Sequence, residues 1–153
     1  MSEGEVIKEI PGTMQTVGVL VFSKDNSKVL LVKHTEAAQN EEGIYGLPAG
    51  KIELGESRKE AAVRELMEET GLNATQDSLE KYEGNYFGAY ITRTKGQVIR
   101  HAHMEVFHCT AYEGVLKDDK KTIPEWVEVS KISEFKTMPN IVAAVNNYLN
   151  SIR

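Results

Sequence analysis

Residues 50–72 have the form of a glycine-bearing loop that leads directly into a helix. Ser57 has the side chain of a helix N-cap, and Glu60, three residues later, completes the pattern of a capping box. No Pro or Gly interrupts the segment before Gly71, a residue type that commonly ends a helix in the left-handed conformation. The sequence therefore predicts a helix from Ser57 to Gly71. Its apolar side is formed by Ala62, Val63, Leu66 and Met67.

Three carboxylates are expected on the opposite side of this helix. Glu65, Glu68 and Glu69 stand at positions i, i+3 and i+4, so their side chains converge on one patch. Like charges at these spacings destabilise a helix by about 0.2–0.5 kcal/mol per pair. A cluster of oxygen ligands suits a hard cation such as Mg²⁺. By itself the helix is compatible with either a solvated acidic face or a metal site.

The loop residues favour the metal site. From Gly50 the chain follows the pattern G-x5-E-x7-R-E-U-x-E-E-x-G-U, where U is a bulky aliphatic residue. The fixed positions are filled by Gly50, Glu56, Arg64, Glu65, Leu66, Glu68, Glu69, Gly71 and Leu72. This stretch resembles the signature of the Nudix hydrolases, with no departure from it.

The resemblance implies hydrolysis of a nucleoside diphosphate linked to another moiety, by attack of water on one phosphorus. It also implies Mg²⁺ as the cofactor, with Mn²⁺ as a substitute. The implied metal ligands are Gly50, Glu56, Glu65, Glu68 and Glu69. Catalytic roles are expected for Glu65, Arg64 and Glu68. The general base is either Glu65 or a residue of a late loop, for which Glu125 is the candidate.

Contacts with the substrate lie outside the signature. Tyr90 lies about where some family members that act on dinucleoside polyphosphates carry a tyrosine, and aromatic rings can stack on nucleobases. His101, His103 and Glu105 alternate, so on a strand they share one face. They form an ordinary polar stripe or a transition-metal site, and a histidine such as His103 could instead contact substrate phosphate.

Four substrate classes and one other function stay open. The substrate is a nucleoside triphosphate or a nucleotide conjugate, with a dinucleoside polyphosphate or ADP-ribose as alternatives. A nucleotide-sensing module of the same fold, without catalysis, is the alternative from another class.

Composition limits the partners. The net charge of −5 argues against a general nucleic-acid binder, which needs a basic surface to neutralise phosphates. Cys109 is the single cysteine, so there is no disulfide framework and no cysteine zinc site. The sequence has neither the apolar core of a signal peptide nor an apolar run near the roughly 20 residues that span a membrane. We therefore expect a cytoplasmic protein that binds a small nucleotide, but neither a nucleic-acid duplex nor a membrane. The oligomeric state stays open, with a homodimer as one candidate because dimers are the commonest assembly.

The rest of the chain predicts an α/β fold in one domain over residues 1–153, with residues 1–12 as a loose lead-in. We expect a β-hairpin from residues 14–22 and 28–33, a short strand at 44–49, a second hairpin from 77–93 and 97–112, a short strand at 126–129, and a closing helix at 140–152. The charged run at 117–121 is expected to be a solvated loop. Strands on either side of a central helix predict an α/β/α sandwich with a mixed β-sheet, which agrees with the Nudix fold that the resemblance implies.

Overall fold

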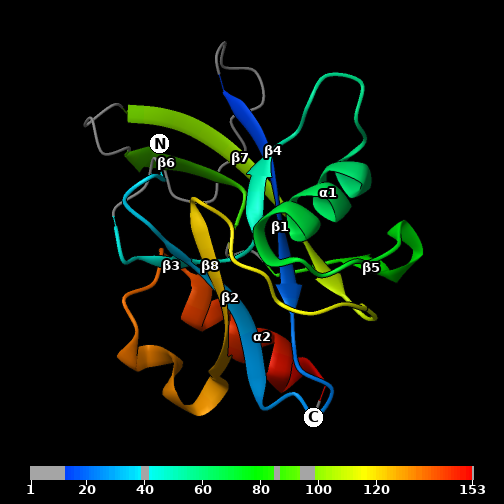
Figure 1. The fold of residues 1–153 in the computed structure, drawn as a ribbon, viewed down its shortest axis with the longest axis vertical. Helices are drawn as coiled ribbons and strands as arrows, with labels where there is room; N and C mark the ends of the chain where they lie inside the picture. Colours follow the sequence, from blue (N-terminus) through cyan, green and yellow to red (C-terminus); the bar gives the residue numbers. More distant parts are fainter. Residues whose placement is uncertain (1–12, 39–41, 85–86, 94–98, 153) are drawn as a thin grey trace.

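The computed structural model describes residues 13–38, 42–84, 87–93 and 99–152, and for residues 89–93 and 99–101 it describes the backbone alone. Two helices, α1 (Arg58–Thr70) and α2 (Ile141–Ser151), pack on opposite sides of β-structure that consists of two sheets (Figure 1). The α/β/α sandwich that the sequence predicts is confirmed.

The larger sheet is mixed and is built around β1 (Met14–Val21) and β7 (Ile99–Cys109), which run parallel. On its other side β1 pairs antiparallel with β4 (Ala49–Lys51). Two short strands, β5 (Leu79–Lys81) and β6 (Ala89–Arg93), pair antiparallel with opposite ends of β7. The predicted second hairpin is therefore present as β6 and β7, and the residues that join them lie outside the described residues.

The smaller sheet is antiparallel and has the order β3 (Tyr45–Gly46), β2 (Lys28–His34), β8 (Thr122–Glu128). The prediction that the first two strands pair as a hairpin is wrong, because β1 and β2 belong to different sheets. Only their turn ends meet, through an isolated bridge between Phe22 and Val29. Both strands are buried on both faces, so each is a central strand, and each pairs with two other strands.

The short strand predicted at residues 44–49 is two strands, one in each sheet. β3 pairs with β2, whereas β4 pairs with β1. Leu47 and Pro48 cross between the sheets, and the carbonyl of Pro48 accepts a hydrogen bond of 2.9 Å from the N–H of Val19. The segment that enters the glycine loop is thus tied to both sheets.

The predicted ends of α1 are confirmed. The Ser57 side chain accepts a hydrogen bond from the N–H of Glu60, and the Glu60 carboxylate accepts one from the N–H of Ser57. Gly71 ends the helix with a φ of 84°. The buried face, however, includes Thr70 and leaves Met67 exposed, so the apolar side lies further round the helix than predicted.

Each helix has its own core. The α1 core includes Val17, Val19, Leu30, Leu66 and Phe107. The α2 core includes Leu20, Leu31, Val106, Val127 and Val145. Because alternate residues of β1, β2 and β7 enter different cores, each of these strands is covered on both faces.

Two 3₁₀ helices, η1 (Gln76–Ser78) and η2 (Val129–Glu134), complete the elements. The strand predicted at residues 126–129 is the end of β8, and the closing helix is α2, with Asn140 at its N-cap. None of the helices in the described part of the chain is long and apolar enough to span a bilayer.

Candidate active site

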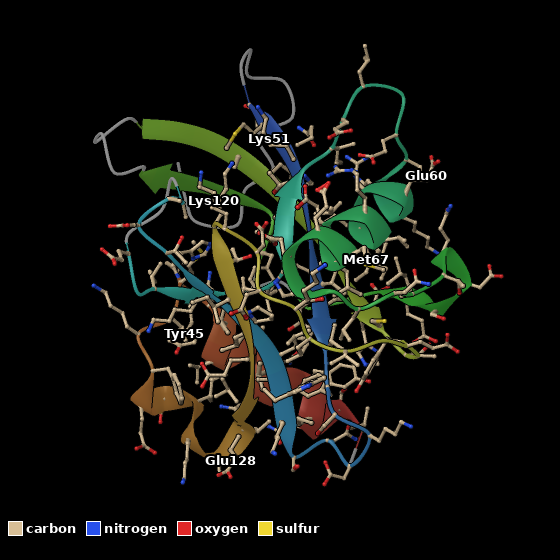
Figure 2. All side chains as sticks on the ribbon, in the orientation of Figure 1. Tyr45, Lys51, Glu60, Met67, Lys120 and Glu128 are labelled. Carbon is tan, nitrogen blue, oxygen red and sulfur yellow. The ribbon has the colours of Figure 1, made fainter. Side chains whose placement is uncertain are left out.

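Arg64 joins the carboxylates of the signature. Its Nε and Nη2 donate to the two carboxylate oxygens of Glu56 over 2.6 and 2.9 Å. Its Nη1 donates to Glu65 over 2.8 Å and to Glu68 over 3.2 Å. Nη2 also donates to the carbonyl of Lys51, which lies on β4 beside α1 (Figure 2). Hydrogen bonds from the guanidinium lower the pKa of Glu56 to about 2, and those carboxylates raise the pKa of Arg64 itself. One arginine therefore ties the loop, the helix and β4 together.

Glu65 lies directly against the backbone of Gly50. A Cβ atom at residue 50 would collide with the Glu65 carboxyl group, so any other residue there would have to displace it. The Glu65 side chain is 13% exposed. Burial raises the pKa of Glu65, although the hydrogen bond from Arg64 opposes the rise. The glycine of the signature is thus explained by the space that a carboxylate occupies.

Glu69 is bonded to the backbone that precedes Gly50. Its Oε1 accepts a hydrogen bond of 2.6 Å from the N–H of Ala49. Burial raises the pKa of Glu69 to about 8, and the charges of Glu65, Asp119 and Glu68 add to the rise. A carboxyl group that is buried among other carboxylates is the kind of group that a nearby cation stabilises in its charged form.

The ridge carboxylates of α1 are Glu65, Glu68 and Glu69, and they do not share one environment. Glu65 and Glu69 are partly buried and approach β4, whereas the Glu68 side chain is 53% exposed. On a helix of 3.6 residues per turn, Glu65 and Glu69 lie on the edge of the buried face that contains Ala62 and Leu66. Of the three carboxylates, only Glu68 therefore lies on the exposed side of the helix, as predicted.

Asp119 was not among the expected site residues. It belongs to the charged run that the sequence favours as a solvated loop, yet it is near enough to Glu69 to raise the pKa of that residue. The loop docks on the end of α1, where the N–H of Lys117 donates to the carbonyl of Thr70 over 2.8 Å. Gly71 permits this approach, since a Cβ there would lie 2.7 Å from the carbonyl oxygen of Val115. The glycine at this position can be recognised from the sequence, but the loop that packs against it cannot.

The chemical type of the candidate ligands suits a hard divalent ion. In the described part of the chain, no three His, Cys, Asp or Glu side chains are grouped as a ready-made metal site. Arg64 binds Glu56, Glu65 and Glu68, while the Ala49 N–H binds Glu69, so these carboxylates have protein partners. All the candidate side-chain ligands of the ion are carboxylate oxygens, which are the ligands that Mg²⁺ takes in proteins.

The predicted substrate contacts remain predictions. Tyr90 lies on β6 with its backbone opposite Ala102, and its side chain is outside the described residues. His103 lies on β7 and is 9% exposed. Of the stripe that contains it, the His101 side chain is outside the described residues, and Glu105 forms an ion pair of 2.7 Å with Arg58. The described contacts thus favour the polar-stripe interpretation over a transition-metal site.

Glu125 does not lie in a loop. It is within β8, where its carboxylate accepts a hydrogen bond of 2.8 Å from the hydroxyl of Tyr45. Burial, followed by this bond, raises the pKa of Tyr45 to about 12. Trp126 packs against the α1 core and Val127 belongs to the α2 core, so alternation places Glu125 on the α2 side. This position separates it from Glu65 and Glu69, which lie on the α1 side.

A groove of about 560 Å³ lies on the α2 side, away from the carboxylates of α1. It runs between β5 and the end of α2, and Glu80, Tyr82, His108 and Tyr148 are among its lining residues. The hydroxyl of Tyr82 donates to Asn147 within it. The larger sheet separates this groove from Glu65, so the groove is not part of the acidic site.

Comparison with known proteins gives the same assignment as the signature. A family model described as NUDIX domain matches residues 12–145. A CTP pyrophosphohydrolase of Escherichia coli (strain K12) is 24% identical over 126 residues, which cover 82% of this chain and 86% of that protein. A dihydroneopterin triphosphate diphosphatase of Haemophilus influenzae is 24% identical over 151 residues, covering 91% and 89%. The crystal structure of a MutT protein from Methanosarcina mazei Go1 superimposes with a TM-score of 0.71 at 21% identity, covering 95% of this chain and 99% of that one.

Proposed function

The chain belongs to the NUDIX domain family, a family of phosphoanhydride hydrolases, and from that premise we propose that it is a Mg²⁺-dependent pyrophosphohydrolase of nucleoside triphosphates. The observation that carries the proposal is the contact of the Glu65 carboxyl with Gly50, inside a group of carboxylates that Arg64 holds together. Two relatives, aligned over 82% and 91% of the chain, are named for nucleoside or pterin triphosphate substrates, which supports a triphosphate here.

The proposed ion ligands are Glu56, Glu65, Glu68 and Glu69, with the carbonyl of Gly50. When bound, a divalent ion neutralises charge on phosphate oxygens and makes water a stronger nucleophile. Asp119 adds negative charge beside Glu69 and is a further candidate ligand. We propose Mn²⁺ as a substitute ion, since it accepts the same oxygen ligands.

The protein's own groups orient the reactants and accept the proton. Arg64 restrains Glu56, Glu65 and Glu68 by charge-assisted hydrogen bonds, so little reorganisation is needed when the substrate binds. We assign Glu65 as the general base, because it is the ridge carboxylate that lies against the loop and burial raises its pKa. A proton passes from the attacking water to the Glu65 carboxylate, the new bond from oxygen to phosphorus forms, and the bridging bond between phosphorus and oxygen breaks.

A substrate panel with Mg²⁺ tests the proposal. Nucleoside triphosphates, ADP-ribose, dinucleoside polyphosphates and sugar nucleotides are each incubated with the full chain, and products are separated by ion-exchange chromatography. We expect a nucleoside monophosphate and pyrophosphate from at least one triphosphate. Reaction in ¹⁸O-labelled water identifies the phosphorus that is attacked, because the label enters that product. Tight nucleotide binding without any product would instead support a sensing module and refute the hydrolase assignment.

A further inference from the structure

Arg58, the first residue of α1, is bound to two strands of the larger sheet. Its Nε lies 2.7 Å from Oε2 of Glu105 on β7, and its Nη2 donates to the side-chain oxygen of Gln15 on β1 over 3.3 Å. The side chains of Arg58 and Glu105 are 43% and 21% exposed. Neither residue belongs to the signature or has a part in the proposed chemistry.

Glu105 and Gly50 stand on one row across the sheet. Val17 of β1 pairs with Glu105 on one side and with Gly50 on the other. Val17 belongs to the α1 core, so this row faces α1. Neighbouring strands lie about 4.8 Å apart, and the row from Glu105 to Gly50 therefore spans about 10 Å.

Arg58 and Glu65 repeat this spacing along the helix. They are seven positions apart, which corresponds to nearly two turns and to about 10 Å along the axis. Two turns return to the same face of a helix, so both side chains are directed toward the sheet. Arg58 reaches Glu105 at one end of the row, and Glu65 lies against Gly50 at the other.

We propose that the Arg58–Glu105 pair is a positioning element that fixes α1 across the sheet and so sets where Glu65 lies relative to Gly50. This role rests on the proposed function, because it serves the same site. The site tolerates little displacement, since Gly50 leaves no spare volume beside Glu65 and the bond from Ala49 to Glu69 is 2.6 Å long. A shift of α1 along its axis moves both carboxylates together. The pair acts through geometry, because partly exposed ion pairs contribute little to stability.

The test compares Arg58→Gln and Glu105→Gln with the charge-swapped double variant Arg58→Glu/Glu105→Arg. Glu128→Gln is the matched control, since it breaks the exposed Glu128–Lys131 pair of 3.6 Å on β8 and η2, away from α1. For each full-length variant, Mn²⁺ affinity is measured by electron paramagnetic resonance and the unfolding temperature by calorimetry. The kcat and KM are measured separately on the best substrate of the panel.

We expect each single variant to weaken Mn²⁺ binding and to lower kcat by about tenfold, because a misplacement of 1 Å costs about a hundredfold and a smaller shift costs less. KM should change by less than about twofold, and the swapped pair should recover most of the Mn²⁺ affinity. Unchanged Mn²⁺ affinity in both single variants, with an unfolding temperature that falls as in the control, overturns the proposal. Failure of the swapped pair to bind Mn²⁺ better than the single variants does the same. A wild-type protein that binds Mn²⁺ but hydrolyses nothing refutes the proposed function alone, and the Mn²⁺ titrations still decide the positioning role.

Discussion

Replacement of Gly50 by Ala tests whether Glu65 must lie against the backbone of β4. The backbone there does not have a positive φ, so alanine is conformationally acceptable and its lower flexibility would stabilise the fold by about 0.4–1 kcal/mol. The new methyl group, however, displaces the Glu65 carboxyl and with it the hydrogen bond from Arg64, which is worth about 1.5–3 kcal/mol as a charge-assisted bond. The difference predicts a net loss of about 0.5–2.6 kcal/mol and a fall in unfolding temperature of about 1–10 °C.

Expressed as free energy, the effect of Gly50→Ala on kcat should exceed its effect on the free energy of unfolding. A carboxylate that moves by about 1 Å at a reacting centre costs about a hundredfold in kcat, which is measured by pyrophosphate release under saturating substrate and Mg²⁺. Gly18→Ala is the matched control. Gly18 pairs with Ala49, and a Cβ there would lie 2.9 Å from the Sδ atom of Met104, a flexible side chain on the α2 side of the sheet. This control should lose some stability but keep its kcat.

A double variant separates the collision from other effects of the methyl group. In a Glu65→Ala background, Gly50→Ala meets no carboxyl group, so its destabilisation should disappear to within about 0.5 kcal/mol. The reasoning is refuted if Gly50→Ala keeps kcat within about threefold of wild type. It is also refuted if the stability penalty persists when Glu65 has been removed.

Three further variants test other parts of the site and the fold. Glu69→Gln should abolish Mg²⁺-dependent pyrophosphate release. Burial raises the folded-state pKa of Glu69 from 4.5 to about 8, so wild-type stability falls as pH rises through this window. Above pH 8 and without metal, calorimetry should therefore show that the neutral variant unfolds at a higher temperature than wild type. Glu60→Ala removes half of the capping box and should lower stability by about 0.5–1 kcal/mol in urea titration with kcat unchanged; a large loss of kcat would contradict its role as a cap. Burial lowers the pKa of His34 below 6.5, so the unfolded state binds the proton more tightly and stability is lost as pH falls below 6.5. His34→Asn, whose amide can donate to the Ile44 carbonyl as Nδ1 does, should weaken that pH dependence of the urea midpoint, and an unaltered dependence would exclude His34 as its source.

The ends of α1 could be predicted from the sequence because their signals are local. Ser57, Glu60 and Gly71 act within one turn of their own positions, and all three have the predicted geometry. Strand partners depend on distant parts of the chain. The turn between β1 and β2 is present, but each of these strands pairs with two others from elsewhere in the chain. A turn signal does not carry that information, and the fully buried character of both strands was the better indication of central positions.

The site, like the fold, could be predicted from the sequence only in part. The spacing of the signature identifies which residues gather, and Arg64 does bind Glu56, Glu65 and Glu68. The spacing could not show that Glu69 is directed at the Ala49 N–H, because that contact depends on how α1 packs on β4. For the same reason the pattern could not separate the exposed Glu68 from its two partly buried neighbours.

Gly71 shows how one residue links a local signal to a distant contact. Its left-handed φ of 84° ends α1, which explains a glycine at this position of the signature. The absence of a side chain also admits the carbonyl of Val115, and the docked loop then brings Asp119 into the electrostatic environment of Glu69. A residue with a side chain at this position would therefore strain the helix end and push the loop away at once. The glycine is required twice, and its second role ties the acidic helix to a loop more than forty residues further along the chain.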